Sequence, residues 1–117
     1  MPAWVFVVRQ VLDPYPGEIS RPTELPANMR VVAAEVVIDN QSSLSMEFAA
    51  GDIHLKEDNG FEYSAGTVVG EEPRLVSQNL PDGERTRGWV WFLVPQDSIV
   101  TEMRLFAPAP VIRVPLA

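Results

Sequence analysis

His54 is the only histidine of the chain, and it is the residue best suited to acid–base chemistry. A Ser-His-Asp hydrolase needs an imidazole as its base, so any such site would have to be built around it. His54 alternates with Ile53 and Leu55, which places it on the polar face of a short strand. No Gly-x-Ser-x-Gly motif, which presents the serine of many hydrolases, occurs in the sequence. We interpret His54 as a solvated strand residue and expect the chain not to be an enzyme.

A second candidate for chemistry is the oxygen-rich segment Glu57-Asp58-Asn59-Gly60. Its side chains offer the ligands that Ca²⁺ prefers, but their spacing does not match the helix-loop-helix calcium loop. Asp, Asn and Gly are also favoured in tight turns for backbone reasons. We therefore expect a hairpin turn here and leave calcium binding at Asp58 and Asn59 open. One histidine and no cysteine exclude histidine-rich and thiolate metal sites, and no cofactor is expected.

A pair of tryptophans is the most informative feature for binding. A strand expected over residues 88–94 has one face made of Val90, Phe92 and Val94 and another made of Trp89, Trp91 and Leu93. If the first face packs inside the protein, the second faces outward, and so large an apolar row is unusual for a monomer. Either the chain's own loop or terminal strand covers this row, or the row is an interface, where tryptophan is enriched.

The charge of the chain excludes some partners. Sixteen acidic and nine basic residues give a net charge of −7. That sign opposes the phosphate backbone of nucleic acids and the surface of anionic membranes. No apolar run approaches the ~20 residues needed to cross a bilayer. We expect no nucleic-acid binding and no direct membrane insertion, and we expect a protein partner, which includes a second copy of the chain.

The elements that must position these residues are strands. Eleven prolines and seven glycines separate short β-branched runs, a pattern typical of a sandwich or barrel, and no segment has helical periodicity. Strands are expected over residues 4–12, 29–39, 44–48, 53–56, 61–63, 88–94, 99–107 and 111–116. Residues 64–85 are expected to be mostly loop, with a weak apolar patch at residues 67–69. The proline-rich loop after residue 12 is long enough to cross between two sheets.

The inner faces of the two strongest strands define the expected core. Alternation places Val32, Ala34, Val36 and Ile38 of one strand and Val90 and Phe92 of the other in a buried position. Their burial would indicate two packed sheets rather than a single layer.

Three segments, in this order, resemble the bacterial domain-of-unknown-function family 4352. They are a long strand ending in asparagine (residues 30–40), an Asp-x-Gly-x-x-Tyr hairpin (residues 58–63), and a Pro-Gly-Glu-like turn followed by Gly and a Val-x-Phe-x-x-Pro strand (residues 80–95). The turn here reads Pro-Asp-Gly-Glu, one residue longer than the family's. The resemblance covers roughly residues 28–107, and its specificity lies in the order and spacing of the motifs.

The resemblance implies an immunoglobulin-like, antiparallel two-sheet sandwich of about seven to nine strands, related in fold to a mycobacterial immunoprotective secreted antigen. Residues 1–117 would form one such domain. Family members usually follow a signal peptide or lipid anchor on envelope proteins, so the resemblance implies an extracytoplasmic location. The segment after Met1 shows no such signal, and a cytoplasmic location stays open.

Three classes of function follow from these observations. The first is a non-catalytic interaction module of a bacterial envelope or secreted protein, with a protein or glycan partner. The second is a structural domain that self-associates through the outer apolar face at Trp89, Trp91 and Leu93. The third, an unrecognised hydrolase, lacks an identifiable nucleophile and base.

Overall fold

The computed structural model describes residues 4–19, 26–65, 70, 73–106 and 111–116. The strands are β1 (Trp4–Leu12), β2 (Met29–Asn40), β3 (Met46–Phe48), β4 (Ile53–Glu57), β5 (Glu62–Ser64), β6 (Gln78–Leu80), β7 (Arg85–Pro95), β8 (Val100–Leu105) and β9 (Ile112–Pro115). A single 3-10 turn, η1 (Ala50–Asp52), precedes β4, and no α-helix occurs in the described residues. Nine strands confirm the predicted all-β class and strand number.

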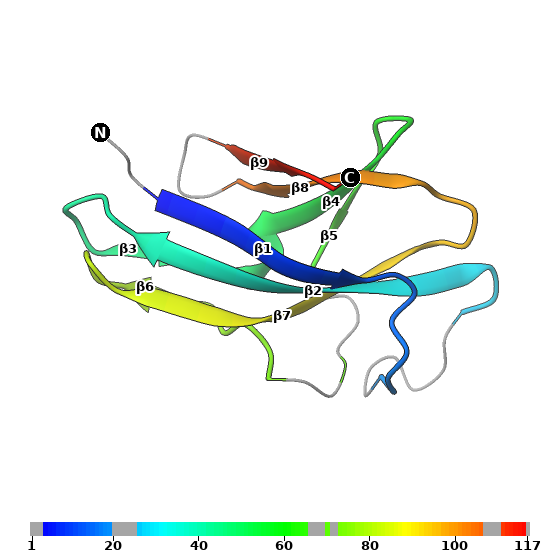
Figure 1. Ribbon diagram of the computed structural model, residues 1–117, viewed down its shortest axis with the longest axis horizontal. Helices are drawn as coiled ribbons and strands as arrows, with labels where there is room; N and C mark the ends of the chain where they lie inside the picture. The colour runs from blue at the N-terminus through cyan, green and yellow to red at the C-terminus, as the bar shows by residue number, and fades with distance from the viewer. Residues whose placement is uncertain (1–3, 20–25, 66–69, 71–72, 107–110, 117) are drawn as a thin grey trace.

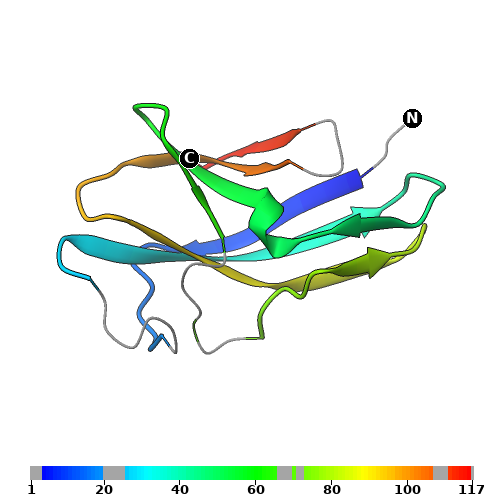
Figure 2. The same cartoon turned by 180° about the vertical axis from the view of Figure 1, so that it is seen from behind.

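The strands form two facing layers. One layer is the sheet β1-β2-β7, and the other is the sheet β5-β4-β8-β9 (Figures 1 and 2). A short β3-β6 ladder lies toward the end of the first layer where β2 ends. All pairs of named strands are antiparallel. The chain is therefore an antiparallel β-sandwich, as predicted.

The core lies between the layers and is built by alternation along β2 and β7. Side chains on one face of each strand point inward, and Val32 lies opposite Phe92 in the register. The predicted inner residues Val32, Ala34, Val36, Ile38, Val90 and Phe92 are all buried. The second sheet contributes Ile53, Leu55, Met103 and Leu105, each with no exposed surface. This arrangement confirms the predicted core.

The loop between β1 and β2 does not cross between sheets, and that prediction is wrong. β1 and β2 are antiparallel neighbours in one sheet, with Phe6 opposite Ile38. The length of the loop has another use, because it folds back over the outer face of the sheet. A hydrogen bond holds its first part there, because the backbone N–H of Tyr15 donates to the carbonyl of Val31 at 2.7 Å.

Two further expectations need correction. Leu44 is 65% exposed and lies before β3, because its carbonyl accepts hydrogen bonds from the side chains of Asn40 and Ser42 in the turn. Strand β6 lies inside the segment that was expected to be loop. Its three residues are too few for a period of two to be visible in the sequence. The apolar patch expected at residues 67–69 lies outside the described residues.

Candidate functional site

The loop after β1 covers the outer face on which the tryptophans lie. Trp91 is only 2% exposed, and the ring of Tyr15 packs edge-on against it, with centroids 6.2 Å apart and planes at 73°. Val31 and Ala33 complete this second buried cluster. Trp91 is therefore covered by its own chain.

A second segment closes over the same indole. A Cβ atom placed on Gly70 would lie 2.3 Å from Nε1 of Trp91 and 2.8 Å from the hydroxyl oxygen of Tyr15. Only a residue without a side chain can pass so close. Trp89 and Leu93, the other two predicted surface residues, are half-buried and pack against the cluster. Their contact with a partner stays a prediction.

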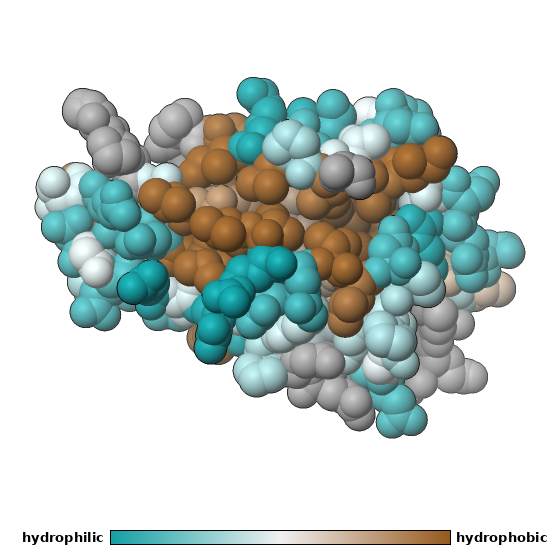
Figure 3. Space-filling model, viewed as in Figure 1, coloured by the Kyte–Doolittle hydropathy of each residue, from teal (hydrophilic) through white to brown (hydrophobic). Residues whose placement is uncertain are grey.

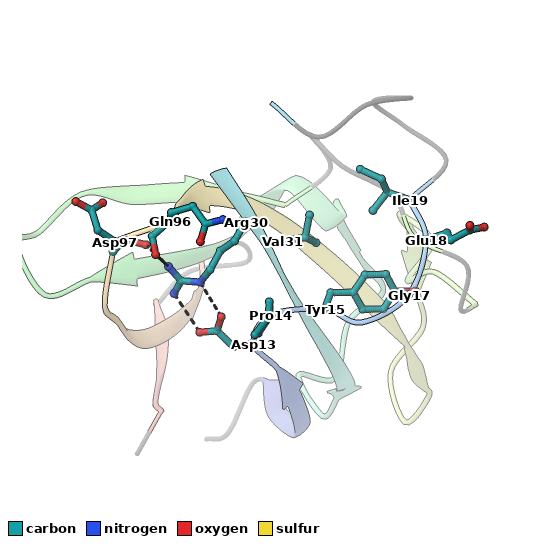
Figure 4. Close-up of a pocket in the computed structure, with 11 residues that line it drawn as sticks. Asp13, Pro14, Tyr15, Gly17, Glu18, Ile19, Arg30, Val31, Gln96 and Asp97 are labelled. Carbon is teal, nitrogen blue, oxygen red and sulfur yellow. Dashed lines mark hydrogen bonds and ion pairs between the residues drawn. The ribbon is translucent and has the colours of Figure 1, made fainter. Parts of the chain in front are cut away.

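A hollow of about 780 Å³ opens beside this covered face, at the end of the sandwich where the β1–β2 loop meets the β7–β8 turn (Figure 4). That volume is within the ~300–1,000 Å³ range of ligand sites. The lining residues are Asp13, Pro14, Tyr15, Gly17, Glu18 and Ile19 of the loop, Arg30 and Val31 of β2, and Gln96, Asp97 and Ser98 of the turn.

Arg30 holds the two sides of the pocket together. Its Nε and Nη2 donate to the two carboxylate oxygens of Asp13, at 2.7 and 3.1 Å. Its Nη1 donates to the carbonyls of Pro95 and Gln96 and to the hydroxyl of Ser98, at 2.8, 3.0 and 3.2 Å. The paired geometry with Asp13 is the strong, bidentate form of an arginine–carboxylate contact. Figure 4 shows the guanidinium between the loop and the turn.

The pocket has a net negative charge, because Arg30 is paired with Asp13 and the other charged residues of the lining are acidic. The hydrogen bond to Asp13 is the main reason why the pKa of Arg30 is raised, and the charges of Asp97 and Glu57 act in the same direction. Because the guanidinium is engaged, it has little capacity left for an anionic ligand. The carboxylates of Glu18 and Asp97 are exposed and make no ion pair among the described residues. In Figure 4 they lie at opposite ends of the lining set.

His54 lies elsewhere, in a small charged cluster on β4 and β5. Its Nδ1 is 3.2 Å from Oε1 of Glu62, whose other oxygen accepts a hydrogen bond from Arg104 at 3.0 Å. Ser64 is opposite His54 in the register, but its hydroxyl donates to the carbonyl of Gly51. In the part of the chain that the structure describes, His54 thus has a carboxylate partner and no hydroxyl bonded to its ring.

The predicted turn at Asp58-Asn59-Gly60 is confirmed. Gly60 has φ of +96°, and its N–H donates to the carbonyl of Glu57 at 3.0 Å. The side-chain oxygen of Asn59 accepts a hydrogen bond from the N–H of Phe61. Across the described ranges, no three His, Asp or Glu side chains gather closely enough to hold a metal ion.

Arg30 was not recognised from the sequence as a site residue. In the sequence it is only one of the polar residues of a strand. Its partner Asp13 lies 17 residues away, and its partners after β7 lie 65 or more residues away. The one local signal is Asp13-Pro14, which begins the long loop. A charged residue near the start of a strand does not indicate which distant carbonyls it will contact.

The chain belongs to the family described as "Domain of unknown function (DUF4352)", whose model matches residues 4–109. The match extends the expected resemblance to β1 and to the loop that covers Trp91. No curated protein matches the sequence significantly.

Three solved structures are similar in fold. A candidate lipoprotein of Bacillus subtilis, YcdA, has a TM-score of 0.75 at 11% identity, and the match covers 97% of this chain but only 36% of YcdA. YjhA of Bacillus subtilis gives 0.69 at 15% identity, with 100% and 95% covered. The secreted protein MPT63 of Mycobacterium tuberculosis gives 0.63 at 15% identity, with 93% and 79% covered. The chain thus spans little more than a third of YcdA, and these identities establish the shared fold alone.

Among the described residues, no helix is long and apolar enough to cross a bilayer.

Proposed function

We propose that this domain is a non-catalytic binding module of an extracytoplasmic bacterial protein, and that the pocket beside Arg30 receives a cationic side chain of a protein partner. The extracytoplasmic part of the proposal is supported by the printed descriptions of YcdA and MPT63, a candidate lipoprotein and a secreted protein. The non-catalytic part is supported by the contacts of His54, which face Glu62 rather than a nucleophile.

The class of ligand is inferred from Arg30, whose guanidinium already donates hydrogen bonds to groups of the protein. Its bonds to Asp13 and to two carbonyls hold it in place, so the charges left for a ligand belong to Glu18 and Asp97. A lysine or arginine entering the hollow would find, at either end of it, a carboxylate without an ion pair among the described residues, while Val31 and Ile19 would contact its aliphatic stem.

The preformed walls favour such a ligand. Both sides of the pocket are fixed before binding, because Arg30 ties the loop to the turn and Tyr15 is docked on β2. A site that is already ordered loses less conformational entropy on binding. The pocket therefore suits an exposed lysine or arginine at the centre of a larger interface.

The test uses a short dye-labelled peptide with one central lysine and otherwise Gly and Ser. We expect binding near a Kd of about 1 mM or weaker, because one exposed ion pair contributes little. The double variant Glu18→Gln/Asp97→Asn should weaken it at least about threefold. Glu47→Gln/Glu84→Gln is the matched control, because it also removes two exposed carboxylates and neither residue lines the pocket. A peptide with glutamate in place of lysine that binds as well or better would overturn the proposal.

A further inference from the structure

The free edge of β1 is the least protected strand edge in the described part of the protein. β1 pairs only with β2, and residues 4–8 read Trp-Val-Phe-Val-Val, with no charge and no proline. Natural sheets guard their edges with charges, prolines, bulges or short strands. In β1 the first protective feature is at Arg9, which is charged and lies where the register with β2 shifts.

The other edges are guarded. β3, β5 and β6 have three residues each, and β9 carries Pro115. The outer edge of β7 is covered in its middle, since the N–H of Leu75 donates to the carbonyl of Trp89 and the N–H of Trp89 donates to Pro73. Among the strands that the structure describes, only β1 is long and has an edge run without charge or proline.

The direction of the backbone groups on β1 follows from the bonds of Asn40. Its N–H donates to Glu84 at 2.9 Å and its carbonyl accepts from Gly83 at 2.7 Å, so its backbone faces β7. In an antiparallel sheet this direction alternates, so Asp39 and Val37 of β2 face β1. The backbone N–H and C=O groups of their register partners, Val5 and Val7, therefore face β2.

The backbone groups of β1 that do not face β2 therefore point away from the sheet. They are the N–H and C=O of Trp4, Phe6 and Val8, which alternate with Val5 and Val7. No backbone hydrogen bond from these three residues to another described loop or turn is present. The free edge thus offers three donors and three acceptors in a straight row.

We propose that this edge pairs with the same edge of a second copy of the chain, antiparallel and centred on Phe6. In that register Trp4 lies opposite Val8 of the other copy, and Phe6 lies opposite Phe6. Every residue with outward backbone groups then meets another such residue, and each of these pairs exchanges two hydrogen bonds. The two three-stranded sheets would join into one continuous sheet.

The side chains suit this register as well as the backbone does. Val5 and Val7 lie on the outer face, 38% and 45% exposed, and each would meet the other across the new contact. A shift of two residues in one direction places Val5 opposite Arg9, and a shift in the other direction also loses hydrogen bonds. The run is self-complementary in only one register.

An apolar surface continues this edge toward the second sheet. A hollow of about 360 Å³ lies between β1 and β9, lined mainly by Val8 and Val11 on one side and by Val114 and Leu116 on the other. Figure 3 shows apolar side chains gathered in a band across the face on which β1 and β9 lie in Figure 1. A second copy on the edge of β1 would extend over this band.

The net charge of −7 constrains how such a dimer behaves. Two like-charged copies repel, so association must come from backbone pairing and apolar contact. Salt screens the repulsion and should strengthen the dimer. A dimer held by ion pairs would respond in the opposite direction. We expect a Kd on the order of 10–100 µM.

The test compares two double variants of the exposed valines by sedimentation equilibrium. Val5→Lys/Val7→Lys places like charges opposite each other and should weaken the dimer at least about tenfold. Val5→Lys/Val7→Glu places lysine opposite glutamate in the proposed register and should preserve it. Thermal unfolding should show that both monomers remain folded, because both positions face solvent.

Each alternative outcome contradicts the proposal. A wild type that stays monomeric up to about 500 µM removes the dimer. A dimer that tolerates the Lys/Lys variant uses another surface. A dimer that the Lys/Glu variant disrupts as strongly as the Lys/Lys variant has another register, because the registers shifted by two residues in either direction place like charges opposite each other. This interface is separate from the pocket, so neither result depends on the proposed function.

Discussion

Asn40 is a buried polar residue whose side chain joins three segments. Its Nδ2 donates to the carbonyls of Leu44 and Leu80 at 2.8 and 2.7 Å, and its Oδ1 accepts from the N–H of Ser42 at 2.9 Å. Asn40 has no exposed surface, and its bond to the Leu80 carbonyl is buried, so this side chain supplies a hydrogen bond inside the protein. The asparagine that ends the long strand in the family resemblance thus closes one end of the sandwich.

Removing that amide should be costly. Asn40→Ala removes the side-chain partner of the Leu80 carbonyl and of the Ser42 N–H, and one of the two donors to the Leu44 carbonyl. We expect a loss of about 2–4 kcal/mol in the free energy of unfolding. Asn79→Ala, on the exposed face of β6, is the control and should cost little. Urea denaturation of both variants measures the difference. Equal losses in the two would contradict the role given to Asn40.

The hydroxyl of Tyr63 should make stability depend on alkaline pH. It donates to Oε1 of Glu57 at 2.6 Å, and this bond, together with burial and the charge of Glu57, raises the pKa of Tyr63 to about 12. Since the folded pKa is above the usual 10, the contribution is fully present below pH ~10 and is lost as pH rises through ~12.

Ultraviolet difference titration of the wild type against Tyr63→Phe reads this pKa directly. The phenolate signal removed by the substitution should have its midpoint near pH 12. The variant should also lose less stability than the wild type between pH ~10 and ~12. A midpoint near 10 would show that the bond to Glu57 does not form in solution.

At the scale of elements, β7 is fixed along both of its edges. β2 pairs with it over its length, and residues 73–75 lie along the other side. Gly88 allows the second contact, since a Cβ there would lie 2.5 Å from the N and Cα atoms of Leu75. The obstacle is backbone, which cannot rotate away as a flexible side chain would.

Gly88→Ala should therefore loosen the segment at Leu75. We expect a loss of about 1–3 kcal/mol and faster hydrogen exchange of the Leu75 and Trp89 amides, whose bonds join the two segments. Gly51→Ala is a suitable control, because its Cβ would meet nothing closer than 3.6 Å. Unchanged exchange at Leu75 in the Gly88 variant would mean that the segment adapts.

Trp91 joins the β1–β2 loop to the sheet in a comparable way. Because the indole is buried under Tyr15 and Gly70, Trp91→Ala should lower monomer stability by about 3–5 kcal/mol. It should leave the self-association constant unchanged, since Trp91 reaches no partner. Trp89→Ala, at a half-buried position, should cost less. Weaker association without a loss of stability would instead support the outer face as an interface.

The strands could be predicted from the sequence where a period of two is long enough to see. Val32 to Ile38 and Val90 to Phe92 repeat that period, and their burial followed directly. The partner of each strand could not be predicted, because pairing depends on contacts far apart in the chain. The length of the β1–β2 loop alone therefore predicts a crossover, whereas the loop joins neighbouring strands and covers Trp91. Arg30 was missed for the same reason, since its acceptors at Pro95 and Gln96 are distant in sequence.

At the scale of the whole molecule, the sandwich separates two surfaces. The pocket lies at the end where the β1–β2 loop meets the β7–β8 turn, and the free edge of β1 lies along the side (Figure 1). Binding in the pocket and pairing at the edge therefore use different residues. The net charge of −7 acts on both, since it attracts a cationic partner and opposes a second copy.

The central claim is that the pocket beside Arg30 takes a cationic group, and chemical-shift mapping tests it most directly. Lysine amide is titrated into ¹⁵N-labelled protein, with acetate as the anionic comparison. We predict that lysine amide shifts the amide signals of Asp13, Glu18 and Arg30 and of residues 96–98 in a saturable way, while acetate leaves these signals in place. Shifts that are scattered over the acidic surface, or a saturable response to acetate at these amides, would contradict it.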